Sequence, residues 1–185
     1  MPTPFTSALE RIDHEHSQDP NKITVDGKEL PYELHYASKM THYLTLHEPN
    51  ASELLRLAVR AQHLRRWEIP RSSYPMDRQG YFAWRAAQKN KQAEHVREIC
   101  VECGYSPEDA GRVASLVRKE GMKSDPECQI LEDVACLVFL DDQFEEFRTK
   151  HDEEKIKSIL KKTWAKMSER GHQLALEIPG VKQWI

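Results

Sequence analysis

Hydrophobic side chains recur every three or four residues along almost the whole chain, which is the spacing of one helix face. Between Thr3 and His16, this spacing places on one side Phe5, Ala8, Leu9 and Ile12. Similar patterns follow at residues 32–47, 51–66, 81–103, 107–119, 125–140 and 152–176. We therefore predict an all-α fold, a single-domain helical bundle of about six to seven helices over residues 1–185.

Three segments lack the helical spacing. Residues 17–30 form a loop or a short hairpin around Asp26-Gly27, which is a favoured two-residue turn. Residues 68–80 contain two prolines and no periodicity, so we expect an ordered loop there. A loop that follows a polar helix end is a common place for substrate contacts. Residues 178–185 are predicted to be a tail.

Composition narrows the class of protein. Charged residues make up 31% of the chain and the net charge is -3, which gives no general electrostatic attraction to nucleic acid. No apolar run approaches the roughly 20 residues of a membrane span. The first ten residues lack a secretory signal, so we expect a cytoplasmic protein whose four cysteines are reduced thiols. The Cys100-x-x-Cys103 pair lies in a helical pattern and is not expected to be a redox or zinc motif.

Polar and cationic residues gather where the predicted third helix ends. An apolar face precedes this end, and the candidate binding residues there and in the loop beyond are Gln62, His63, Arg65, Arg66, Trp67, Arg71 and Tyr74. One interpretation is a binding site at the helix end. The other is a core histidine beside solvated arginines, because cations are favoured at helix C-termini.

Carboxylates inside an apolar helix are a second candidate. Glu132 and Asp133 lie in the most hydrophobic segment, residues 125–140. A carboxylate that points inward there needs a metal, an arginine or helix-end amides to compensate it. The alternative is that both residues lie on the solvent-exposed side of this helix. Further polar groups near helix ends are Glu33, His95, Lys119 and Glu120, and bundle sites are assembled from such positions.

The order of these residues resembles the architecture of HD-domain metal-dependent phosphohydrolases. In that superfamily an early His, a His-Asp pair and a late Asp hold one or two divalent metals. The resemblance is strongest over residues 90–140, and it implies a metal set of Glu33, His63, His95 and Asp133. This chain has His63-Leu64 in place of the His-Asp pair, and Glu33 in place of the first His. Such ligands suit zinc, manganese or iron, and no metal binds if the departure from the His-Asp pair is decisive.

Longer motifs identify the family of the whole chain. They are Gln62-His63-x-x-Arg66-Trp67-x-x-Pro70-Arg71-x-x-Tyr74-Pro75, Gly80-Tyr81-x-x-Trp84-Arg85, residues 131–140 and Lys162-Thr163-Trp164-x-Lys166-Met167-Ser168. On these the chain is identified as a member of an uncharacterised domain family of fungi and bacteria. Its members are often mislabelled glutamyl-tRNA synthetase, although the sequence has no Gly-rich nucleotide loop. The family supplies no activity.

Two functions follow as hypotheses. The first is a divergent HD-like hydrolase of a phosphate-containing, nucleotide-like small molecule. Its metal would activate water, Arg65, Arg66, Arg71 and Arg85 would clamp the phosphate, and Trp67, Tyr74 and Trp84 would stack on a flat group. Lys119 would add charge and Glu120 would act as general base. The second is a non-catalytic binder of an anionic metabolite or protein partner. RNA binding through the same arginines is a third reading, which the net charge opposes.

Overall fold

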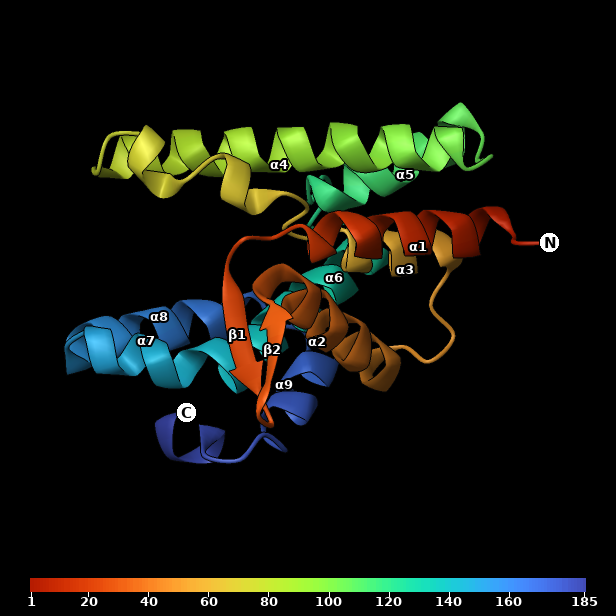
Figure 1. Ribbon diagram of the computed structural model, residues 1–185. Coiled ribbons are helices and arrows are strands. Elements are labelled where there is room, and N and C mark those ends of the chain that lie inside the picture. Colours follow the sequence, from red (N-terminus) through yellow and green to blue (C-terminus); the bar gives the residue numbers. More distant parts are fainter. The chain divides into compact units, whose positions relative to one another are not determined.

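The computed structural model describes residues 1–185, which form two compact units. The first unit comprises Met1–Thr41 and Ser52–Glu120, and the second comprises His42–Ala51 and Gly121–Ile185. Nine α-helices and one two-stranded sheet confirm the prediction of an all-α fold (Figure 1). The likeness to HD-domain proteins stays a prediction. The prediction of a single domain also stays a prediction. The two compact units are defined by how the chain packs, whereas a domain is a part of the chain that can fold by itself.

The first unit is built mainly from helices that the sequence predicts. Its elements are α1 (Pro4–Ser17), β1 (Lys22–Val25), β2 (Lys28–Pro31), α2 (Tyr32–His47, whose residues from His42 belong to the second unit), α3 (Glu53–Arg60), α4 (Arg78–Glu102) and α5 (Pro107–Val117). Figure 1 shows α4 running along α5, and both α5 and α1 contact α3. Two short 3-10 turns, Arg66–Glu68 and Arg71–Ser73, lie between α3 and α4.

Local sequence explains the ends of these elements. Thr3 caps α1, because its side chain accepts a hydrogen bond from the Thr6 amide and Pro4 fills the first turn. The predicted hairpin is confirmed: β1 and β2 pair antiparallel, and the turn residues Asp26 and Gly27 both have positive φ. Ser106 caps α5 in the same way as Thr3 caps α1.

The second unit departs further from the prediction. It contains α6 (Pro126–Val138), a π-helical turn (Phe139–Gln143), α7 (Phe144–Lys150), α8 (Glu153–Lys166), α9 (Glu169–Ala175) and a final 3-10 turn (Val181–Trp184). The single helix predicted over residues 152–176 is wrong. Met167 has an extended backbone that ends α8, and the side chain of Ser168 then accepts a hydrogen bond from the Gly171 amide and starts α9.

Asp133 is the polar centre of the second unit. Its fully buried carboxylate accepts hydrogen bonds from His47 Nε2 (2.7 Å), Ser168 N (2.8 Å) and Gln129 Nε2 (2.9 Å), and also from Ser168 Oγ. Burial alone would raise the pKa of Asp133, but these hydrogen bonds hold it below its ordinary range. A Cβ at Gly171 would lie 2.8 Å from Asp133 Cγ, so α9 approaches the carboxylate as closely as glycine allows.

This arrangement predicts that Asp133 is essential for stability. Asp133→Leu removes the acceptor that His47 Nε2 and the Ser168 amide share inside the second unit, so we expect a loss of roughly 3–5 kcal/mol in the free energy of unfolding. Urea denaturation followed by circular dichroism measures it. The control is Glu146→Leu, which removes only an exposed ion pair to Lys150. Equal stabilities of Asp133→Leu and the wild type would show that this carboxylate holds nothing together.

Candidate functional site

The segment that follows α3 has an unusual backbone. The predicted third helix, residues 51–66, is wrong at its end: α3 stops at Arg60, and His63 (φ 63°) and Arg65 (φ 52°) have left-handed conformations. Such residues cost about 1 kcal/mol each and cluster at functional sites. Two amides of α4 hold the segment in place. Gln92 Oε1 accepts from His63 N (3.2 Å), and Gln88 Nε2 donates to the Arg66 carbonyl (2.9 Å).

The imidazole of His63 is surrounded by groups from α2 and from the 3-10 turn that begins at Arg66. It stacks on the ring of Tyr36, with centroids 4.1 Å apart and planes at 11°. Glu33 Oε2 lies 3.3 Å from His63 Nδ1, and Arg66 Nη1 lies 3.2 Å from His63 Nε2. The side chain of His63 remains 22% exposed, so solvent reaches this group. The structure therefore brings together three of the residues that the sequence singles out, Glu33, His63 and Arg66.

Glu33 is held in this position by the start of α2. Asp19 Oδ2 accepts a hydrogen bond from the Glu33 amide (2.9 Å), which fixes the first turn of the helix. The Glu33 carboxyl is then buried, and its Oε2 atom has no hydrogen-bond partner. Burial raises the pKa of Glu33 to about 7, against the opposing effect of Arg66 and His16. A carboxyl with this pKa can gain or lose a proton near neutral pH.

Several cations act electrostatically on the imidazole. Burial, followed by the charges of Arg66, Arg85 and Lys119, holds the pKa of His63 well below its ordinary value. Lys119, two residues after the end of α5, has a positive φ of 57°, and Arg85 is an exposed residue of α4 that makes no ion pair. The ring is therefore neutral at pH 7 and the neighbouring carboxyl is only partly ionised. Arg66 and Arg85 make no ion pair while the Glu33 carboxyl is only partly ionised, and this balance of charge favours an anion.

These residues do not fit the divalent metal that the HD resemblance implies. No group of three or more His, Cys, Asp or Glu side chains in the structure is placed to hold a metal ion. Glu33 and His63 supply two donors, and the arginine and lysine charges around them repel a dication. Asp133, in the second unit, already accepts four hydrogen bonds.

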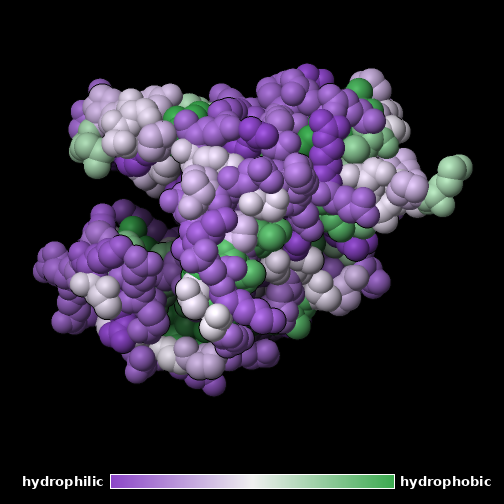
Figure 2. Space-filling model, in the orientation of Figure 1, coloured by the Kyte–Doolittle hydropathy of each residue, from purple (hydrophilic) through white to green (hydrophobic).

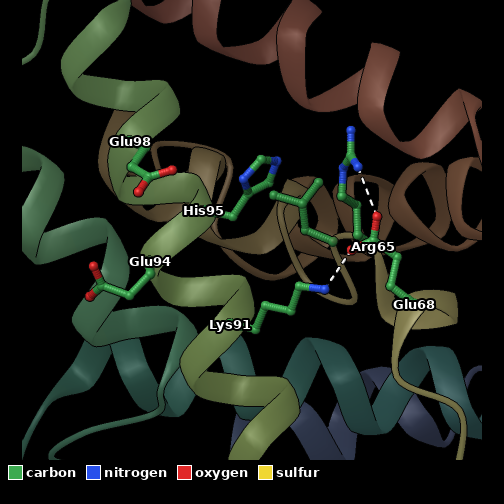
Figure 3. Close-up of a pocket in the computed structure, with 7 residues that line it drawn as sticks. Arg65, Glu68, Lys91, Glu94, His95 and Glu98 are labelled. Atoms are coloured by element: carbon green, nitrogen blue, oxygen red, sulfur yellow. Dashed lines mark hydrogen bonds and ion pairs between the residues drawn. The ribbon is translucent and has the colours of Figure 1, made fainter.

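Two predicted residues, Arg65 and His95, belong to a different pocket (Figure 3). This pocket of about 290 Å³ is lined by Leu64, Arg65, Glu68, Lys91, Glu94, His95 and Glu98. His95 Nε2 lies 3.4 Å from Glu15 Oε2, and Arg65 pairs with Glu15 and with Glu68. Figure 3 shows Glu68 between Arg65 and Lys91. The cations of this pocket are thus paired with carboxylates, whereas Arg66 and Arg85 make no ion pair.

Other predicted residues hold the fold instead of facing a ligand. Arg71 donates to the carbonyls of Tyr74, Pro75 and Asp77, so its guanidinium shapes the loop before α4. Trp84 is buried, and its Nε1 donates to the Ile69 carbonyl (2.8 Å). The remaining predicted residues are Gln62, buried and bonded to the Ala58 carbonyl, Trp67 and Tyr74, half-buried, and Glu120, exposed.

His16 and Tyr36 are site residues that the sequence reasoning missed. His16, at the end of α1, is fully buried, and its Nε2 lies 2.8 Å from the Arg60 carbonyl. Its Nδ1 atom has no hydrogen-bond partner. The helical spacing of both residues was a signal in the sequence. His16 follows Ile12 by four residues, which places it on the apolar face of α1, and Tyr36 follows Glu33 by three, which places it beside Glu33 on α2.

The comparisons with known proteins agree with the family inferred from the motifs. The chain belongs to the family defined by a domain of unknown function, DUF4202, whose model matches residues 6–184. No curated protein and no solved structure matches the chain. None of the helices combines the length and apolar character needed to cross a membrane.

The raised pKa of Glu33 predicts a pH-dependent stability. Glu33 holds its proton more tightly in the folded state, so its contribution to the free energy of unfolding is complete below its ordinary pKa of 4.5 and is lost as the pH rises to about 7. Glu33→Gln cannot ionise, so the variant does not lose this part of its free energy of unfolding as the pH rises. We expect the variant to gain up to about 3 kcal/mol on the wild type across that interval.

Urea denaturation at several pH values between 4.5 and 8 measures this gain. Glu10→Gln, an exposed change in α1, is the control and should show no such trend. A difference between Glu33→Gln and the wild type that stays constant with pH would contradict the raised pKa.

Proposed function

We propose that the protein binds a phosphate-bearing small molecule at the His63 site. The observation that carries the proposal is the surplus of positive charge around a neutral imidazole. Arg66, Arg85 and Lys119 all act on His63, and the carboxyl beside it is Glu33, whose pKa of about 7 leaves it partly protonated. A dianion placed among these cations would gain attraction from each of them.

The geometry of the cations supports phosphate over a simple halide. Arginine presents a planar fork that matches two oxygens of a phosphate group. Arg85 is exposed and unpaired, so it can receive an anion from solvent without breaking an existing ion pair. Arg66 is half-buried against His63 and Trp84, so its charge is presented from a fixed direction. Preorganised charges of this kind lose little freedom on binding.

Hydrolysis of a phosphoester is the second candidate function, and the pKa of Glu33 favours it. A protonated carboxyl beside a bound phosphate can give its proton to the leaving oxygen while water attacks phosphorus. The P–O bond of the ester breaks, the alcohol leaves, and a proton from the attacking water returns to the carboxylate. Glu33 is favoured over Glu120 for this proton transfer, because Glu33 lies next to His63 and Glu120 is exposed.

The binding proposal predicts that Arg85 determines anion affinity. Because a hydrogen bond to a charged group contributes roughly 1.5–3 kcal/mol, Arg85→Gln should weaken inorganic phosphate binding about tenfold or more. Isothermal titration calorimetry at constant ionic strength, set with chloride, measures it. Arg97→Gln is a matched control, since it removes the same charge from an arginine of α4 that pairs with Glu94. An equal loss of phosphate affinity in both variants would show that only the net charge of the protein matters, and it would contradict a phosphate site at Arg85.

The catalytic proposal predicts a separable effect of Glu33. Glu33→Gln keeps the size of the side chain but cannot donate a proton to a leaving group, so we expect release of phosphate from a monoester such as p-nitrophenyl phosphate to fall at least a hundredfold. Phosphate affinity, measured by calorimetry on the same preparation, should change by much less. An active wild type whose activity is unaffected by Glu33→Gln would exclude Glu33 as the acid. An inactive wild type that binds phosphate would leave the protein a binder only.

A further inference from the structure

Two exposed aromatic side chains stand next to each other near the start of α4. Figure 2 shows hydrophobic residues reaching the visible surface only in small separate groups. The side chains of Tyr81 and Phe82 form one exposed group. The two residues are 42% and 56% exposed, and their ring centroids lie 5.8 Å apart. Arg78 and Arg85 share their side of the helix, because residues three or four apart are neighbours on a helix surface. This aromatic pair is not needed to fill a core.

Arginines contact each aromatic ring at this end of α4. The guanidinium carbon of Arg78 lies 5.5 Å from the ring centroid of Phe82, and that of Arg71 lies 5.9 Å from Tyr81. No carboxylate pairs with Arg78 or Arg85. The surface is therefore both aromatic and positively charged, although the whole chain has a net charge of -3. Aromatic faces that alternate with cations bind bases and phosphates together.

The aromatic pair is continuous with the anion site. Arg66 contacts the imidazole of His63, and its guanidinium carbon also lies 5.2 Å from the ring centroid of Trp84. The ring of Tyr81 lies 6.1 Å from that of Trp84. Arg85, one turn beyond Tyr81, also acts on His63. The cations near His63 and an exposed aromatic surface thus adjoin at Trp84 of α4.

We propose that the ligand is a nucleotide, whose base stacks on Tyr81 and Phe82 while its phosphate binds Arg66 and Arg85. This inference rests on the proposed function and adds the chemical class of the ligand. A nucleotide carries a flat aromatic ring and a phosphate group joined by one sugar, which matches adjoining aromatic and cationic surfaces. The role expected of Trp84 as a stacking platform passes to Tyr81 and Phe82, because Trp84 is buried.

The test compares AMP, inorganic phosphate and adenosine by calorimetry on the full chain. Base stacking on aromatic side chains is worth enough for AMP to bind roughly tenfold or more tightly than phosphate. The double variant Tyr81→Ala with Phe82→Ala should lose this advantage and keep its phosphate affinity. Tyr81→Phe should keep the advantage, because the ring remains. Val101→Ala, an exposed change near the other end of α4, is the control and should match the wild type.

The outcomes separate the two proposals. If the wild type binds AMP and phosphate equally well, or if the double variant binds AMP as the wild type does, the base subsite is wrong and the phosphate site stands. If neither AMP nor phosphate binds, the proposed function fails. If AMP has no advantage over phosphate but a single-stranded oligouridine binds tightly and loses affinity in the double variant, the surface is an RNA interface and the nucleotide proposal is overturned.

Discussion

The candidate site depends on the burial of one carboxyl group beside an imidazole. Removing Glu33 and His63 from water disfavours the charged form of each, which raises the pKa of the first and lowers that of the second. The two groups sit 3.3 Å apart without forming a hydrogen bond on Glu33 Oε2. Such an arrangement costs stability and persists only because the surrounding elements fix it. Asp19 holds the start of α2, and the amides of Gln88 and Gln92 hold the left-handed segment after α3.

Asp133 and Glu33 are both buried carboxyls, and their hydrogen bonds show why the first is structural and the second is a candidate for function. Asp133 accepts four hydrogen bonds, so its pKa falls and its oxygens are all engaged in joining α6 to α9 and to the end of α2. Glu33 leaves one oxygen without a partner and has a pKa near 7. A satisfied group stabilises, whereas an unsatisfied group near cations remains available to a ligand. The sequence ranked both as metal ligands and could not make this distinction.

Much of the helical framework could be predicted, because apolar spacing and caps are local signals. The capped start of α1, the Asp26-Gly27 hairpin and the bounds of α2 follow from residues within one turn of each boundary. The end of α3 could not be predicted, because the left-handed turn at His63 is held by Gln92 of α4, which lies 29 residues further along the chain. The break at Met167 was visible only as a serine cap inside an otherwise continuous helical pattern.

In the candidate site, the sequence indicated which types of side chain take part more readily than it indicated the groups with which each side chain pairs. Glu33, His63 and Arg66 converge as polar groups near helix ends often do, but Arg65 and His95 pair with Glu15 in a separate pocket. Arg71 looked like a phosphate clamp, and the structure commits its donors to backbone carbonyls of its own loop. Sequence shows which side chains can bind an anion, but only the tertiary structure shows which of them are already neutralised.

The central claim is that the imidazole of His63 borders an anion site. The most direct measurement is a long-range 1H–15N NMR titration of the histidine side chains with sulfate, which stays fully ionised between pH 5 and 8, at constant ionic strength. The account predicts saturable shifts of the His63 ring nitrogens, with no comparable change at His151, an exposed histidine after α7. Shifts that are absent at His63, or that rise linearly and equally at every histidine, would contradict it.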